Sequence, residues 1–227
     1  MMSLVELDDV EIRILGCLAE KAVTTPDNYP LSTNALVNAC NQTSNRDPVM
    51  SVTEREVDQA MLDLRTAGLA RTVTGGRANK HRHVIDEAWG LDPGELAVLA
   101  VLFLRGAQTT GELRGRTERM HDFADLADVE AALARLEARP DPFVRQLDRM
   151  PGQKERRWVH LCGDGDEDGA PTAEARAPVA PAPAVEAASA SAAPPARDEV
   201  GELRAEVARL QRDVDRLYEL LGEERGE

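Results

Sequence analysis

Two histidines, His81 and His83, stand two positions apart in a segment with the pattern of a strand. Alternate strand residues share a face, so both imidazoles would project from the same side. Such a pair is half of a zinc site, but no cysteine pair or further histidine pair accompanies it in the sequence. We therefore predict no metal and no cofactor, and we expect both histidines to be polar side chains on an exposed hairpin.

Basic residues gather in two segments with the pattern of a β-hairpin, 68–84 and 143–161. The first contains four basic residues and no acidic one, and the second contains five basic residues against Asp148 and Glu155. Because arginine and lysine neutralise phosphates, these hairpins are the predicted surface for duplex DNA. The candidate contact residues are Arg71, Arg77, Lys80, Arg82, Arg145, Arg149, Lys154, Arg156 and Arg157, with Arg46 as a further candidate.

The helices predicted to precede these hairpins have the opposite charge. Residues 53–67 and 125–139 each carry four acidic and two basic residues, a net charge of −2. In helix-turn-helix proteins this element enters the major groove, and negative charge opposes its approach to phosphates. If the chain binds DNA, the hairpins should make the contacts, and Arg55 and Arg65 of the first of these helices should matter much less.

Side-chain amides are densest just before Arg46. Asparagine and glutamine can read adenine edges, and arginine can contact guanine or phosphate. The interpretation that we favour is that the amides hydrogen bond to the backbone of a long connection near Pro48. The amide residues are Asn34, Asn38, Asn41, Gln42 and Asn45.

The sequence has no pattern typical of an enzyme. It lacks G-x-S-x-G, the phosphate-binding loop and the dinucleotide-binding glycines, and no cysteine stands at a helix start beside a base. Its carboxylates, such as Glu54 and Asp58, fall beside arginines on predicted exposed helix faces. We expect a binding protein and not an enzyme.

Composition narrows the class of partner and the compartment. The 227 residues carry a formal net charge of −14, so any nucleic-acid contact must come from a local basic patch. The most apolar window, residues 96–104, is about half the length of a membrane-spanning helix, and no signal peptide is evident. Cys17 and Cys40 fall among apolar helical residues and are interpreted as small buried hydrophobes. We expect a cytoplasmic protein that does not enter the membrane.

The first 161 residues contain one pattern twice. LDDVEIRILGCL aligns with LDPGELAVLAVL, and EVDQAMLDL aligns with DVEAALARL. A threonine pair follows the first string of each copy, Thr24-Thr25 and Thr109-Thr110, and each copy ends in a basic hairpin. These matches indicate an internal duplication. The apolar residues 96–104 are then the first helix of the second copy, packed between the two copies.

Each copy has the order helix, helix, helix, hairpin. In the first copy, apolar residues at helical spacing predict a helix over residues 8–22. A second, short helix begins near Ser32. The third opens with a capping box, Thr53-x-x-Glu56, and ends at Gly68. Three helices followed by a two-stranded hairpin are typical of a winged helix-turn-helix domain.

The fold class predicted from these elements is mainly α with small β-hairpins, an α+β chain with two tandem winged helix-turn-helix domains. Hairpin turns are predicted at Gly75-Gly76 and Pro151-Gly152. The Ala- and Pro-rich composition that follows cannot bury a core and predicts a disordered linker. The predicted divisions are 1–85 and 86–162 for the two winged-helix domains, 163–198 for the linker and 199–222 for a coiled-coil helix.

Four long strings in this sequence carry a resemblance to a known family: residues 24–50, 91–117, 121–136 and 151–161. On these residues the chain resembles the YceH-like family of bacterial proteins of uncharacterised function. The resemblance covers about residues 6–161 and implies a pair of winged-helix domains without an established catalytic activity. The carboxy-terminal helix is also similar to tails in that family.

Two functions follow from these observations. The first is a dimeric DNA-binding regulator that contacts duplex DNA through its basic wings, which the hairpin charge favours. The second is a protein–protein adaptor whose acidic third helices dock onto basic partners, which the helix charge favours. A basic patch continuous across both wings would favour DNA, and two separate patches would favour the adaptor.

The carboxy-terminal segment is predicted to form a parallel two-stranded coiled coil, because valine at a and leucine at d favour dimers. The seam consists of Val200, Leu203, Val207, Leu210, Val214, Leu217 and Leu221. The alternative is a single amphipathic helix folded back on the body. We expect the full chain to sediment as a dimer and a chain ending at Cys162 to dissociate; an unchanged dimer at low concentration would rule out dimerisation by the tail.

Overall fold

The computed structural model describes residues 6–74, 79–149, 152 and 154–163. The chain divides into two units, residues 1–176 and 177–227, and all described residues belong to the first. The turn predicted at Gly75-Gly76, the basic residue Arg77, the linker and the coiled-coil seam lie outside the described residues.

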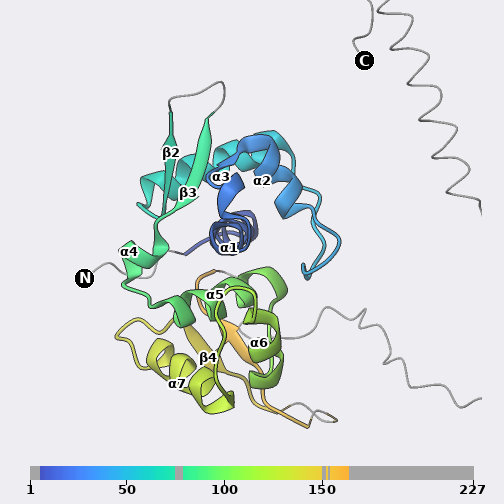
Figure 1. Ribbon diagram of the computed structural model, residues 1–227, viewed down its shortest axis with the longest axis vertical. Helices are drawn as coiled ribbons and strands as arrows, with labels where there is room; N and C mark the ends of the chain where they lie inside the picture. Colours follow the sequence, from blue (N-terminus) through green and yellow to red (C-terminus); the bar gives the residue numbers. More distant parts are fainter. Residues whose placement is uncertain (1–5, 75–78, 150–151, 153, 164–227) are drawn as a thin grey trace, which may run out of the picture. The chain divides into compact units, whose positions relative to one another are not determined.

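One order of elements occurs twice within the described residues (Figure 1). The first copy contains α1 (Asp9–Thr24), the 3-10 helix η1 (Pro26–Asn28), β1 (Leu31–Ser32), α2 (Thr33–Cys40), α3 (Glu54–Thr66), β2 (Ala70–Val73) and β3 (Lys80–His83). The second contains α5 (Pro93–Arg105), α6 (Thr110–Thr117), α7 (Leu126–Glu137), β4 (Val144–Gln146) and β5 (Trp158–His160). Helix α4 (Ile85–Trp89), which the sequence did not predict, joins them. The predicted mixture of helices with small antiparallel sheets is confirmed.

Each copy adds a third segment to its hairpin. In the first copy β3 lies between β2 and β1, and both pairings are antiparallel. In the second copy Gln108 takes the position of β1, because its backbone exchanges two hydrogen bonds with Trp158, of 3.0 and 2.7 Å. In each copy the third segment joins the chain that leads into the second helix to the start of the second hairpin strand.

Capping boxes set the helix starts. The Thr53 box is confirmed, and Asp8 and Asp92 cap α1 and α5 in the same way. The correspondence expected between the two threonine pairs is wrong. Thr109 caps α6, whereas Thr24 ends α1 and the equivalent cap of α2 is Ser32. The first copy inserts η1 at this point, so matching residue types occupy different structural positions.

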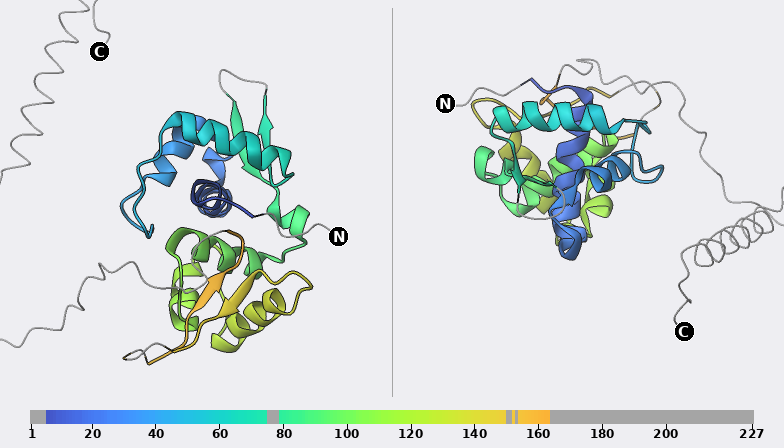
Figure 2. Two further views of the ribbon diagram at one scale, coloured as in Figure 1. Left: turned by 180° about the vertical axis from the view of Figure 1, so that it is seen from behind. Right: turned by 90° about the horizontal axis from the view of Figure 1, so that it is seen from above.

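The two copies meet where α1 packs against α5. Figure 2 shows α1 lying between α5 and the α2–α3 pair. A Cβ at Gly16 would stand 2.9 Å from the Leu104 side chain and 3.0 Å from Cβ of Phe103, so glycine lets the two helices approach closely. The expected burial of residues 96–104 between the copies is confirmed, with Leu99 and Leu102 fully buried.

A buried carboxylate ties α7 to the start of α5. Glu95, which is 3% exposed, accepts hydrogen bonds from Arg135 Nε at 3.1 Å and from Arg139 Nη2 at 2.9 Å. Arg135 also donates to Asp92 at 2.7 Å. Although burial opposes it, the hydrogen bonds that Asp92 receives from the Glu95 amide and from Arg135 lower the pKa of Asp92. The equivalent residue of the first copy, Glu11, completes a capping box but forms no ion pair with an arginine among the described residues.

Replacing Glu95→Gln should therefore cost more stability than Glu11→Gln. Glutamine can still accept the capping hydrogen bond, but at position 95 it leaves a partly buried guanidinium without its carboxylate. We expect the free energy of unfolding in urea to fall by about 2 kcal/mol for Glu95→Gln and by less than about 0.5 kcal/mol for Glu11→Gln. Equal losses in the two variants would contradict this difference between the copies.

Among the described helices, none combines the length and the apolar character that crossing a bilayer requires.

Candidate nucleic-acid interface

The first basic hairpin consists of β2 and β3. Arg71 lies directly opposite Arg82 in the register, and like charges at opposed positions repel. Glu87 of α4 lies 3.6 Å from each guanidinium and neutralises part of this charge. Lys80 is exposed nearer the tip and has no ion pair among the described residues. Among the described basic residues of this hairpin, Lys80 is thus the one whose charge no carboxylate offsets.

The two histidines of this hairpin are buried, at 4% exposure for His81 and 8% for His83. His81 Nε2 is 3.0 Å from Thr33 Oγ1 and its Nδ1 is 3.2 Å from Thr72 Oγ1. The ring of His83 lies beside Tyr29. The shared face is confirmed but the expected exposure is wrong, because this face of β3 packs against the helices. Burial lowers the pKa of both histidines, so neither adds charge near neutral pH.

No group of three histidine, cysteine or acidic side chains among the described residues could hold a metal ion.

The second basic hairpin consists of β4 and β5. Lys154 and Arg156 are exposed between the two strands. Arg157 instead turns back to α6, where its Nη1 is 2.7 Å from the Ala107 carbonyl and 3.0 Å from the Glu112 carboxylate. Across both hairpins, the exposed predicted contacts are Arg71, Lys80, Arg149, Lys154 and Arg156, and the half-buried ones are Arg82, Arg145 and Arg157.

Arg46 is removed from the predicted interface. Its side chain is 0% exposed, and its Nη2 donates to Glu20 at 2.7 Å. Its Nε donates to the Ala39 carbonyl at 3.1 Å. The guanidinium thus neutralises a carboxylate inside the unit and holds the end of α2. The structural interpretation of the amides holds for Asn41, which exchanges two hydrogen bonds of 2.8 Å with the backbone of Val52.

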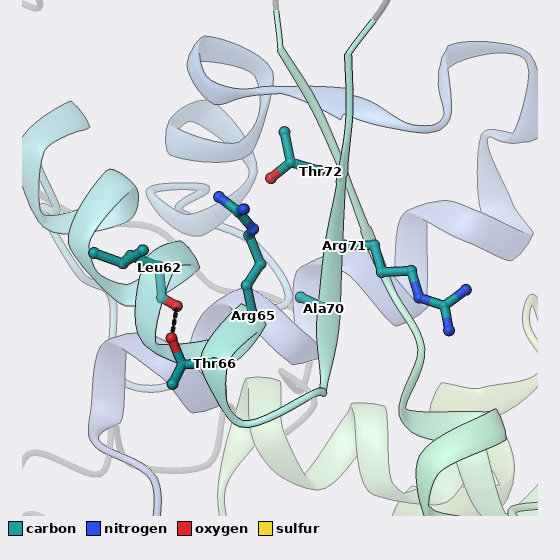
Figure 3. A pocket seen from close by; sticks show the side chains of 6 residues that line it. All are labelled: Leu62, Arg65, Thr66, Ala70, Arg71 and Thr72. Carbon is teal, nitrogen blue, oxygen red and sulfur yellow. Dashed lines mark hydrogen bonds between the residues drawn. The ribbon is translucent and has the colours of Figure 1, made fainter.

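A shallow groove of about 380 Å³ lies between the end of α3 and β2. Leu62, Arg65, Thr66, Ala70, Arg71 and Thr72 line it. Figure 3 shows Arg65 extending from α3 toward Thr72, while Arg71 points away on the other side of the strand. Arg65 is exposed and has no ion pair among the described residues. Sequence reasoning predicted only a minor role for Arg65 in DNA binding because α3 is acidic. Counting charges along the chain could not show that Arg65 lies beside the hairpin.

The third helices keep their acidic surfaces. Glu54, Glu56 and Asp58 are exposed on the first two turns of α3. Arg135 of α7 and Arg139, just beyond its end, bind Glu95 of α5, whereas Asp128 and Glu130 of α7 are exposed. The amino-terminal end that would enter a major groove is therefore negative in both helices.

Known proteins are similar in sequence to this chain over nearly its whole length. Residues 7–153 match the family described as "Protein of unknown function, DUF480", and the chain belongs to that family. A UPF0502 protein of Pelobacter propionicus is 51% identical over 210 residues, 92% of this chain and 95% of the relative. The UPF0502 protein YceH of Salmonella paratyphi A is 43% identical over 226 residues, 96% of this chain and 99% of the relative. The resemblance to the YceH-like family is thereby confirmed.

One further histidine, His160, is half-buried at the base of the second hairpin. The ring of His160 meets Phe103 edge to face, with 5.1 Å between ring centroids. Its Nδ1 has no hydrogen-bond partner among the described residues. Burial lowers the pKa of His160 to about 4.

Acid should destabilise the folded chain through His160. In the unfolded chain a histidine has a pKa of about 6.5, so the unfolded state takes up a proton that the folded state does not accept until about pH 4. The stability contribution is complete above pH 6.5 and falls by about 2 kcal/mol between pH 7 and pH 5. His160→Phe should reduce the difference between the urea unfolding free energies at these two pH values by that amount. An unchanged difference would contradict the burial of the ring.

Proposed function

We propose that this chain is a DNA-binding protein in which two winged helix-turn-helix units contact duplex DNA through their basic wings. The order of three helices and a hairpin in each copy supports the winged-helix assignment. The coiled coil that would pair two chains remains a prediction from the sequence. Catalysis has no part in the proposal.

The observation that carries the proposal is the separation of charge between wings and helices. Lys80 and Arg71 are exposed on one hairpin, and Lys154 and Arg156 on the other. The helix that normally reads bases is negative at its leading end, so base-specific contacts are disfavoured there. Binding should therefore be weak, tolerant of sequence and dominated by phosphates. Arg65, which lines the groove between α3 and β2, adds an exposed positive charge beside the first wing.

Salt dependence tests this mode of binding. Arg157 is held by Ala107 and Glu112 and is not counted. The other contacts would release about five counterions and give a log–log slope of affinity against salt of roughly −4.5; they are Arg77, Lys80, Arg82, Lys154 and Arg156. Replacing Arg77, Lys80 and Arg82 together by alanine should flatten the slope by about 3 and weaken binding to all duplexes alike. Fluorescence anisotropy with several unrelated labelled duplexes measures both quantities.

The matched control is Arg55→Ala on the exposed face of α3, which should leave the slope unchanged. Failure of the wild type to bind any duplex at about 50 mM salt, where phosphate contacts are strong, would refute the DNA proposal. Loss of sequence-specific binding in Arg55→Ala but not in the wing variant would refute the role given to the wings.

The second candidate is a protein–protein adaptor. Two observations favour it. Leu62 of α3 and Leu126 of α7 are exposed, at 51% and 47%, on helices that also expose acidic residues. The two hairpins project on opposite sides of the α1–α5 contact (Figure 1). Separate basic surfaces cannot act as one continuous patch. A basic protein recovered with the full chain after nuclease treatment, and lost on reversing the charge of Asp58 and Asp63, would support the adaptor.

A further inference from the structure

A hollow of about 240 Å³ opens where the carboxy-terminal ends of α1, α5 and α6 come together. Both copies line it, because Glu20 and Thr24 come from α1 and the loop residue Asn45 follows α2, whereas the other lining residues come from α5, α6 and the residues after α6. A second hollow of about 490 Å³ adjoins the first and shares Glu20, Thr24, Asn45 and Arg119 with it. The residues that line the two hollows belong to neither basic hairpin.

Three arginines line the first hollow: Arg105, Arg116 and Arg119. Arg105, the last residue of α5, is half-buried, and its Nη2 donates to Oδ1 of Asn45. Neither Arg105 nor the exposed Arg119 forms an ion pair with a carboxylate in the described part of the chain. Arg116 is 3.5 Å from the Glu112 carboxylate, which another arginine approaches more closely, at 3.0 Å. The hollow therefore contains guanidiniums whose charge is left largely without a partner.

The acidic residues of the hollow do not balance these arginines. Glu20 lines the hollow, but its carboxylate is bound by Arg46 at 2.7 Å. Glu118 is the other acidic residue of the lining, and it is exposed. Three guanidiniums thus face one carboxylate that no other cation neutralises, which leaves an excess of two positive charges.

The guanidiniums also repel one another. Burial, followed by the positive charges of Arg116 and Arg46, lowers the pKa of Arg105, although the negative charges of Glu20 and Asp47 act in the opposite direction. Arginine keeps its proton in proteins, so the repulsion remains as a cost to the folded chain. An anion bound in the hollow would remove this cost and would form charge-assisted hydrogen bonds with the same groups.

The rest of the lining suits an organic molecule larger than a bare ion. Val101, Leu104 and Met120 form an apolar wall in the first hollow. The side chains of residues 41–45 give the second hollow amide and hydroxyl groups. Since a water molecule occupies about 30 Å³ in the liquid, the first hollow alone has room for about eight waters or for a small organic molecule.

We propose that the two hollows form a binding site for a small phosphate monoester, whose phosphate group binds Arg105, Arg116 and Arg119 while its organic part packs against the apolar wall. A phosphate monoester carries a charge of about −1.5 to −2 at pH 7, which matches the excess of positive charge. The planar guanidinium also matches the geometry of phosphate oxygens. This site does not rest on DNA binding, because no hairpin residue takes part in it.

The test uses phenyl phosphate as the probe, with inorganic phosphate and phenol representing its two parts. Titration calorimetry of the full-length chain, without DNA and at about 50 mM salt, measures binding where charge screening is weak. Phenyl phosphate should bind at a single site per chain, at least about tenfold more tightly than inorganic phosphate, because its ring buries apolar surface. Phenol should show no binding.

Two results of this titration would overturn the proposal. The first is that phenyl phosphate does not bind at concentrations of about 10 mM, which would leave less affinity than a specific site provides. The second is equal affinity for phenyl phosphate and inorganic phosphate, which would show that the apolar wall has no part in binding.

Arg119→Ala tests the arginines, and Arg114→Ala is its matched control. Both arginines are exposed near the end of α6, but Arg114 donates to the Ala124 carbonyl at 3.0 Å and lines neither hollow. Because Arg119 has no ion pair in the described part of the chain, its variant should fold, as circular dichroism would verify. Arg119→Ala should weaken phenyl phosphate binding at least about tenfold and Arg114→Ala by less than about twofold. Equal weakening would show that only the general surface charge attracts the probe and would overturn the site.

A duplex titration separates a small ligand from the phosphates of DNA. In the proposed site, Arg119→Ala leaves the salt dependence of duplex binding unchanged. A slope flattened by about one in this variant, in a chain that does not bind phenyl phosphate, would assign Arg119 to the DNA backbone and overturn the proposal. Binding of phenyl phosphate by a chain that binds no duplex would support this site and refute only the DNA-binding function.

Discussion

The packing of α1 against α5 is the contact on which the rest of the described structure depends. Each is the first helix of its copy. Because each packs against its own copy on one side and against the other copy on the opposite side, neither has a broad polar face. Every residue of α1 from Glu11 to Ala19 is buried, and so are all but one from Gly94 to Leu104 in α5. A helix that is apolar on all sides belongs inside a protein, which explains the long apolar run at residues 96–104. Gly16 allows the close approach, and the two hairpins and third helices are left at the periphery.

Local signals in the sequence were sufficient to predict the long helices and the hairpins, but they were insufficient to predict the surroundings of the candidate site residues. Apolar spacing and the Thr53 box identified the helices because these signals act within one or two turns. The exposure of His81 and the role of Arg46 were misjudged because both depend on what the fold brings opposite them: Thr33 for the histidine and Glu20 for the arginine. A hairpin sequence with alternating basic residues does not reveal which of its faces packs on the helices. Charge counts along the chain likewise could not show that Arg65 lies beside β2.

The two copies keep the same frame but secure it with different ion pairs. In the second copy Glu95 joins the start of α5 to Arg135 of α7 and to Arg139, two residues beyond the end of that helix. The first copy has a carboxylate at the equivalent position, Glu11, where burial is the chief cause of a raised pKa. Its buried ion pair is instead between Glu20 and Arg46, near the other end of α1. The two copies therefore share the caps at their helix starts, because these depend on local backbone geometry. Their ion pairs between elements differ, because these depend on the residues that neighbouring elements offer.

Arginines that pair with groups inside the unit affect the charge of its surface. Five arginines of the body direct their guanidiniums to internal partners: Arg13, Arg46, Arg135, Arg139 and Arg157. Each arginine that binds an internal partner removes a positive charge from the surface, so the surface is more acidic than the net charge of the sequence suggests. The exposed carboxylates of α3 and α7 stay on the surface. Part of the positive charge that remains exposed lies on the hairpins, where Glu87 offsets some of it. The rest lies on α3 and on or just after α6, at Arg55, Arg65, Arg114, Arg116 and Arg119. The exposed bases of the hairpins therefore attract negative charge, and the exposed acids of the third helices attract positive charge.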